Sequence, residues 1–192
     1  MIEPTAPMRP TKAQLEAARD KPIPDVIAPD LDVLFCGINP GLYSGATGNH
    51  FAKPGNRFWP ALHASGFTDR LLQPSEKHAL LDQGLGITNL VNRTTARADE
   101  LSREELEKGG RALRRKVLRS RPKFLAVLGL SAFRTAFGRP DSRTGPQEQS
   151  IGDTRIWLLP NPSGLNAHYQ LPDLAKLFAD LRRAASRKRE EE

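Results

Sequence analysis

The chain has 192 residues, of which 38% are hydrophobic and 27% are charged, and its formal net charge is +7. This length fits one domain with its own hydrophobic core, and the excess of positive charge favours a polyanionic partner. The single cysteine, Cys36, excludes an intrachain disulfide and a cysteine-held metal cluster. Neither an apolar run near the roughly 20 residues that span a bilayer nor a signal-peptide pattern is present, so we expect an intracellular, cytoplasmic protein without a structural metal.

The first 30 residues are rich in proline, and we expect them to form a largely extended arm with a short helix at Thr11–Ala18. Residues 31–185 are expected to form one domain, and residues 186–192 a polar tail. Within the domain, short apolar runs indicate four buried strands, at residues 31–36, 85–90, 124–128 and 155–159.

Between these strands, apolar residues recur at helical spacing. Ser102 and Glu105 form a capping box at the start of one such stretch. Helices are expected near residues 58–67, 102–118, after 131 and 171–181. Strands that alternate with helices predict a three-layer α/β/α sandwich with a mainly parallel central sheet. Ligands of such sheets bind beyond the carboxyl ends of the strands, so the loops after the strands are the candidate site.

The loop after the first strand, residues 37–48, contains four glycines. It is either a flexible connector or a loop whose backbone approaches a ligand closely. It lacks the Gly-Lys-Ser/Thr ending of a phosphate-binding loop and the spacing of the dinucleotide fingerprint. The loop after the last strand, residues 160–168, carries an apolar residue, Leu165, among small and polar ones. This leucine either folds back into the core or acts as a wedge that holds a DNA duplex open.

Three segments carry a resemblance to a known family: Gly-Ile-Asn-Pro-Gly at 37–41, Phe-Ala-Lys-Pro-Gly-Asn-Arg-Phe-Trp at 51–59, and Asn-Pro-Ser-Gly-Leu at 161–165. Together they resemble the motifs of the mismatch-specific uracil-DNA glycosylases, the group that includes the thymine-DNA glycosylases. The resemblance covers about residues 31–182. It implies a uracil-DNA glycosylase-like fold and a monomeric DNA repair enzyme that needs no metal or organic cofactor. It also implies that uracil, or a related base such as mismatched thymine, is flipped out of double-stranded DNA and its N-glycosidic bond is hydrolysed. If the source is bacterial, we expect the protein at the nucleoid.

By this resemblance Asn39 is the catalytic residue. An amide is no real general base, but its oxygen can accept a hydrogen bond from water and aim that water at C1′ of the sugar. Uracil leaves as a stabilised anion, so the enzyme mainly needs donors directed at the departing base. Backbone N–H groups from Ile38 to Gly45 are candidates for these donors. The alternative for Asn39 is a turn residue before proline.

Other site residues follow from the same resemblance. Phe51 is expected to stack on the flipped base, with a core phenylalanine as the alternative. Ser44 is expected beside the C5 edge of the pyrimidine, and Asn161 is expected to contact the base or the water. A carboxylate is expected where this chain has Asn92, which makes Asn92 a weaker catalytic candidate, with Asn89 as a second one and an ordinary loop amide as the alternative.

DNA contacts are expected around the last loop. Leu165 is the expected wedge and Gly164 is expected near the opposite base. The resemblance implies Ser-Arg after Leu165, where this chain has Asn166 and Ala167. The missing arginine would be a strong donor to the opposite base, so its absence puts selectivity for an opposite guanine in doubt. Four basic residues near the loops are candidate phosphate contacts, although Arg57 is equally suited to a structural role: Lys53, Arg57, Arg93 and Arg97. The basic group at residues 111–119 has the pattern of a solvated helix face.

Two other functions compete with base excision. One is a binder of mismatched or abasic DNA that retains the fold but does not cleave. The other is a hydrolase of free nucleosides or nucleotides, which leaves the apolar Leu165 and the net positive charge unexplained.

Overall fold

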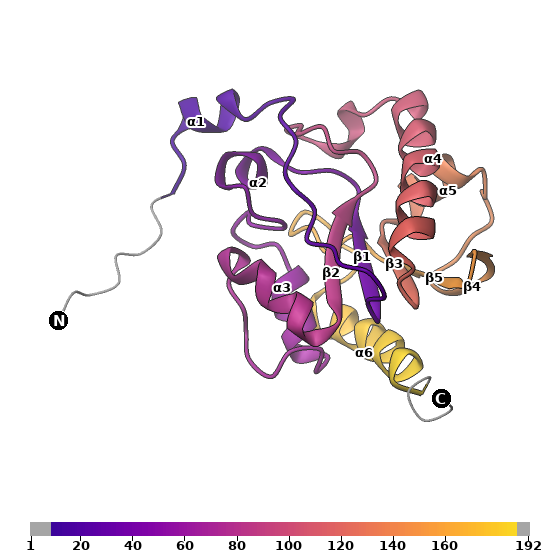
Figure 1. Cartoon of the computed structure of the whole chain (residues 1–192). Helices are drawn as coiled ribbons and strands as arrows, with labels where there is room; N and C mark the ends of the chain where they lie inside the picture. The colour runs from indigo at the N-terminus through magenta and orange to yellow at the C-terminus, as the bar shows by residue number, and fades with distance from the viewer. Residues whose placement is uncertain (1–8, 188–192) are drawn as a thin grey trace.

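The computed structural model describes residues 9–187, which form an α/β fold in three layers (Figure 1). The central sheet has the strand order β2-β1-β3-β5-β4. All neighbouring strands are parallel except β4, which pairs antiparallel with β5 at one edge. The strands are β1 Val33–Gly37, β2 Leu85–Asn89, β3 Phe124–Leu128, β4 Gly145–Ile151 and β5 Thr154–Leu159. The predicted fold class is therefore confirmed.

Helices cover both faces of the sheet (Figure 1). The α-helices are α1 Lys12–Ala17, α2 Leu42–Thr47, α3 Phe58–Ala64, α4 Arg103–Ser120, α5 Leu130–Phe137 and α6 Leu171–Arg187. Two 3₁₀ helices, η1 Pro74–Gln83 and η2 Ala98–Glu100, precede β2 and α4. The helices predicted around Ser102, after Ser131 and near both ends of the chain are confirmed, and none of the described helices is long and apolar enough to cross a membrane.

The alternation of side chains along the buried strands creates two cores, one on each side of the sheet. Phe35 of β1 packs with α3 and α6, and its ring stacks at 5.8 Å from that of Phe178. Its neighbour Cys36 faces the other way and packs with α4 and α5, where Leu113 and Phe133 are buried. Successive residues of a strand point to opposite faces, so a fully apolar run is what a sheet covered on both faces requires.

Besides the two 3₁₀ helices, two elements were not predicted from the sequence. The strand β4 reads Gly-Pro-Gln-Glu-Gln-Ser-Ile, and most of its side chains are exposed or half-buried. It lies at the sheet edge, where a strand needs little apolar character and tolerates proline. Residues 42–47 were expected to be part of a glycine-rich loop but form the short helix α2, which begins after Gly41 and ends at Gly48.

The segment between α1 and β1 packs against the sheet. We call residues 19–26 the strap. Val26 forms an antiparallel bridge with Ile87 of β2, with N···O distances of 2.7 and 2.8 Å in the two directions. Asp25 accepts a hydrogen bond from Thr88 at 2.8 Å and pairs with Lys116 of α4 at 2.5 Å. The strap is thus fastened to β2 and α4 beside the carboxyl end of the sheet.

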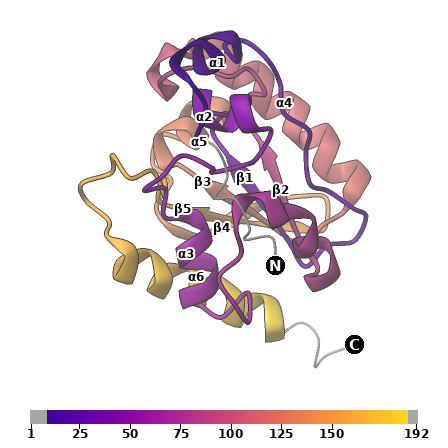
Figure 2. The ribbon, with the colours of Figure 1, turned by 90° about the vertical axis from the view of Figure 1, so that its left-hand side faces the viewer.

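The carboxyl ends of the four parallel strands meet at one end of the sheet. Gly37, the last residue of β1, is in register with Asn89, the last residue of β2. The loops that leave this end are residues 38–57, 90–102 and 160–170. Figure 2 shows the last of these projecting between β5 and α6, away from the body of the protein.

Candidate active site

A pocket of about 400 Å³ opens at the carboxyl ends of β1, β2, β3 and β5. Its size lies in the range of roughly 300–1,000 Å³ that is typical of small-ligand sites. Residues predicted for the site that line it are Ile38, Asn39, Ser44, Phe51, Lys53, Asn89, Arg97, Asn161 and Leu165. Those that do not line it are Arg57, Asn92, Arg93, Gly164 and Asn166. The topology therefore brings residues from three distant segments into one cavity.

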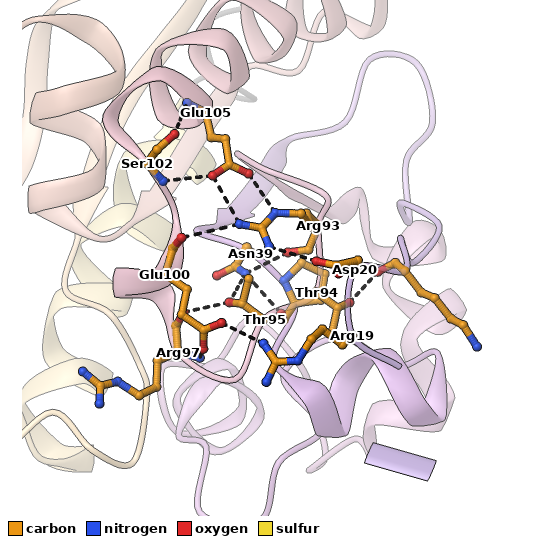
Figure 3. A network of polar contacts seen from close by, with 12 residues as sticks. Arg19, Asp20, Asn39, Arg93, Thr94, Thr95, Arg97, Glu100, Ser102 and Glu105 are labelled. Carbon is orange, nitrogen blue, oxygen red and sulfur yellow. Dashed lines mark hydrogen bonds and ion pairs between the residues drawn. The ribbon is translucent and has the colours of Figure 1, made fainter. Parts of the chain in front are cut away.

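Asn39 lies two residues after β1, and its amide is held by the loop that follows β2 (Figure 3). Its Nδ2 donates to the Arg93 carbonyl at 2.9 Å and to the Thr95 hydroxyl at 2.7 Å. The Arg93 carbonyl can only accept a hydrogen bond. The Thr95 hydroxyl donates its one hydrogen to the Arg97 carbonyl at 2.8 Å, so toward Asn39 it can also only accept. Both groups therefore require the nitrogen end of the amide. The oxygen of Asn39 receives no hydrogen bond from the residues that the structure describes, so it is available to water.

Ion pairs hold the loop that orients Asn39 (Figure 3). The Arg93 guanidinium donates to Glu105 of α4 at 2.7 and 3.2 Å and to Asp20 of the strap at 2.9 Å. The hydrogen bonds from Arg93, and then that from the Ser102 N–H, lower the pKa of Glu105 to about 2. Arg93 was a candidate phosphate contact, but these carboxylates occupy its guanidinium. Its role in the described fold is to fix the loop.

Phe51 has a strained backbone, with φ at 52°, in the left-handed region that non-glycine residues rarely adopt. Such a conformation costs on the order of 1–3 kcal/mol and persists only where the surroundings enforce it. Here Trp59 donates to the His50 carbonyl at 3.0 Å, and Lys77 donates to Asn49 at 2.8 Å and to the Gly48 carbonyl. The ring of Phe51 stacks on Phe58 at 4.1 Å and borders the pocket.

His50 and Asn89 form a hydrogen-bonded pair at the side of the pocket. His50 is buried, with Nε2 at 2.8 Å from the Pro24 carbonyl and Nδ1 at 3.4 Å from Nδ2 of Asn89. The pKa of His50 is lowered, mainly because burial disfavours the charged form of the ring. A Cβ at Gly37 would lie 2.7 Å from Oδ1 of Asn89 and 3.1 Å from the Phe51 ring, so only glycine allows both side chains to occupy this place.

Two further polar side chains border the pocket. The buried Ser44 accepts a hydrogen bond from the Ala52 N–H at 3.2 Å, and so joins α2 to the segment after Phe51. Asn161 accepts from the Ser163 N–H at 3.0 Å through its side-chain oxygen. Its Nδ2 makes no hydrogen bond with the residues that the structure describes. Asn161 therefore offers a donor to the pocket, as Asn39 offers an acceptor.

Arg57 organises the loop after β5. Its Nη1 donates to the carbonyls of Ser163, Asn166 and Tyr169 at 3.1, 3.0 and 3.2 Å. In the described fold Arg57 therefore has a structural role, in the loop after β5. At the tip of that loop Leu165 has 79% of its surface exposed. An apolar side chain held outward on a fixed loop is suited to insertion into another molecule.

The family model described as the uracil DNA glycosylase superfamily matches residues 24–182, which include every residue that lines the pocket apart from Ile23. The chain belongs to the uracil-DNA glycosylase superfamily. Membership assigns this glycosylase to DNA repair, to DNA binding and to the hydrolysis of N-glycosidic bonds in DNA. The part of the strap before Pro24 and the helix α1 lie outside the matched span.

Two predicted site residues of the glycosylase lie away from the pocket. Asn92 is exposed, and its Oδ1 receives a long hydrogen bond of 3.4 Å from the Ile23 N–H. Asn166 is used within its own loop: its Nδ2 donates to the Asn161 carbonyl at 3.0 Å and its Oδ1 accepts from the His168 N–H at 3.1 Å. The amide that borders the pocket after β2 is Asn89, which the sequence offered only as a second candidate.

Lys53 lines the pocket, whereas Gly164 does not, although both residues line a smaller neighbouring cavity. A Cβ at Gly164 would lie 2.7 Å from the Gly55 carbonyl, so glycine permits the two loops to touch. Lys53 is exposed beside them. The orienting residues Thr95 and His50 were assigned no function from the sequence. Their roles depend on contacts between distant segments, and no local pattern indicates them.

Proposed function

We propose that this glycosylase removes uracil from double-stranded DNA, preferably from a mismatch, by turning the nucleotide out of the helix and hydrolysing its N-glycosidic bond. The observation that carries the proposal is the fixed amide of Asn39, whose oxygen is available to water in a pocket bordered by the Phe51 ring. This is the arrangement expected of a site that positions water next to a stacked base.

The pocket supplies complementary groups for uracil. The base stacks on Phe51, which is itself backed by Phe58. Oδ1 of Asn89 accepts the N3–H of the base, and Nδ2 of Asn161 is a donor for a base carbonyl. Ser44 stands beside the C5 edge, where a thymine methyl group has to fit. These assignments rest on the groups that the protein does not use: Nδ2 of Asn89 contacts His50 and its Oδ1 is left for the base, while the side-chain oxygen of Asn161 accepts from Ser163 and its Nδ2 is left for the base.

The chemistry depends mainly on the leaving base. The only acidic side chain in the described lining of the pocket is Asp99, which is exposed and paired with Arg97. Among the described residues that line the pocket, no unpaired carboxylate is therefore present to take a proton from water. The bond between C1′ and N1 breaks with its electron pair moving to the base, and the water held by Asn39 then adds to C1′ and releases a proton to solvent.

The preference for mismatches follows from the cost of opening the base pair. Leu165 fills the space that the flipped nucleotide leaves, and Lys53 contacts a phosphate. Because the Asn166 amide is used inside its loop, it reads the opposite base poorly. A mispaired uracil is cheaper to extrude than a paired one, and this difference alone produces a preference for mismatches.

A cleavage panel tests the proposal. The substrates are uracil opposite guanine, uracil opposite adenine, uracil in a single strand and thymine opposite guanine, each scored as alkali-labile sites. We expect the fastest cleavage for uracil opposite guanine. Tight binding of abasic DNA without release of any base would instead support a binding protein, and release of uracil from free deoxyuridine would support a nucleoside hydrolase.

A further inference from the structure

His50 combines burial with two different partners on its ring nitrogens. Nε2 faces the carbonyl of Pro24 in the strap, and Nδ1 faces the side-chain nitrogen of Asn89 at the end of β2. The residue is 2% exposed, so solvent does not compete for either nitrogen. Each partner therefore constrains where the ring carries its proton.

The proton position follows from hydrogen-bond chemistry. A carbonyl oxygen only accepts, so Nε2 of His50 carries the hydrogen that is directed at Pro24. Burial keeps the ring neutral, and a neutral imidazole has one N–H and one acceptor nitrogen. Nδ1 is then an acceptor. It requires the NH₂ end of the Asn89 amide and repels the oxygen end, so the amide cannot turn over without losing this contact.

This orientation determines what Asn89 offers to a bound base. With Nδ2 directed at His50, Oδ1 lies over Gly37 and beside the edge of the Phe51 ring. All four of these residues, His50 and Asn89 as well as Gly37 and Phe51, line the pocket. Oδ1 receives no hydrogen bond from the described part of the protein, so its lone pairs are available to a ligand.

We infer that His50 is a positioning residue: by orienting Asn89, it selects bases with an N–H at the central position of the Watson–Crick edge and rejects bases with a lone pair there. The inference rests on the proposed function, because it assumes that a base stacks on Phe51. Uracil and thymine carry a hydrogen on N3 and match Oδ1 of Asn89. Cytosine carries a lone pair on N3 and opposes it. The Pro24 carbonyl, through His50, thus sets the choice between uracil and cytosine.

Two substitutions separate this role from a merely structural one. In His50→Gln, the side-chain amide replaces Nε2 and keeps the tie to Pro24, but the acceptor for Asn89 is lost. In His50→Asn, the amide stands near the Nδ1 position and can still accept from Asn89, but the tie to Pro24 is lost. If His50 only anchors the strap, His50→Gln should behave like the wild type and His50→Asn should not. If His50 orients Asn89, the preference for uracil over cytosine should instead be kept in His50→Asn and lowered in His50→Gln.

The measurement is equilibrium binding to duplexes that contain 2′-fluoroarabino-deoxyuridine or -deoxycytidine opposite guanine, because the fluorine suppresses cleavage. We expect the wild type to prefer the uracil analogue, and His50→Gln to lower this preference by roughly tenfold, the value of one hydrogen bond gained or opposed. The same substitution in an Asn89→Ala background should leave the preference unchanged. A wild-type preference in His50→Gln, or a further drop in the Asn89→Ala background, overturns the inference.

A second readout needs no variant. The imidazole ¹⁵N shifts of the wild-type protein should show a protonated Nε2 and an unprotonated Nδ1 for His50, and a ring protonated on Nδ1 overturns the inference. Uracil release by the wild type is measured in parallel. If no DNA substrate is cleaved, the proposed function fails, while the binding preference and the ring proton still report on His50.

Discussion

Replacement of Arg57 by alanine removes the group that holds three carbonyls of the loop after β5. Each net hydrogen bond contributes about 0.5–1.5 kcal/mol. Because Arg57 is only half-buried, we take the lower part of the sum, about 2 kcal/mol, which is roughly a 30-fold shift toward open forms of the loop. The three carbonyls belong to the loop that carries Leu165 at its tip, so the variant should lose the rigid wedge.

The assay is single-turnover cleavage of one uracil oligonucleotide, first as a duplex with guanine opposite and then as a single strand. We expect the duplex rate to fall by roughly 10- to 30-fold, in line with the shift of the loop. The single-strand rate, which needs no wedge, should change little. Lys108→Ala is the control, because it removes an exposed positive charge from α4, outside the pocket lining, without freeing these carbonyls. An unchanged ratio of duplex to single-strand rates in the Arg57 variant would refute this reasoning.

Three further predictions concern other contacts. Thr95→Val should lower the cleavage rate by about tenfold because the Asn39 amide loses one acceptor, whereas Thr95→Ser should retain the rate, as single-turnover kinetics will show. Leu165→Ala should reduce duplex cleavage more than single-strand cleavage, and equal losses on both substrates would argue against a wedge. The pKa of Glu105 is about 2 in the folded protein and near 4.5 without partners, so its contribution to stability is complete above pH 4.5 and is lost as the pH falls toward 2. Denaturant unfolding should show a weaker dependence on pH in this window for Glu105→Gln, and an unchanged dependence would mean that the pair with Arg93 is not formed.

The fold was largely predictable because four of the five strands are buried on both faces. A short apolar run such as 124–128 indicates a strand that is covered on both faces, and its position between helical segments indicates a parallel sheet. The edge strand β4 carries no such signal, since most of its own side chains are polar and are exposed or half-buried. The helix α2 is short and contains a glycine, so its formation depends on packing more than on local propensity.

The sequence predicted which loops form the candidate site, but it did not identify every side chain that lines it. Asn39, Phe51 and Asn161 lie in segments whose motifs and positions after strands indicate them. The choice between Asn89 and Asn92 depends on register, because Asn89 pairs with Gly37 at the strand end while Asn92 lies three residues farther, on the surface. The orienting contacts of His50 join residues 26 and 39 positions apart, and spacing alone cannot predict them.

In the proposed reaction, the oriented amide of Asn39 positions the water that attacks C1′. The most direct measurement is the single-turnover rate of Asn39→Ala on uracil opposite guanine, together with its affinity for abasic DNA. Asn92→Ala is the matched control, since it deletes an amide that lies outside the pocket. We expect a loss of at least roughly 100-fold in the cleavage rate, with abasic DNA still bound and the control close to wild type. Wild-type cleavage by Asn39→Ala would contradict this role of Asn39.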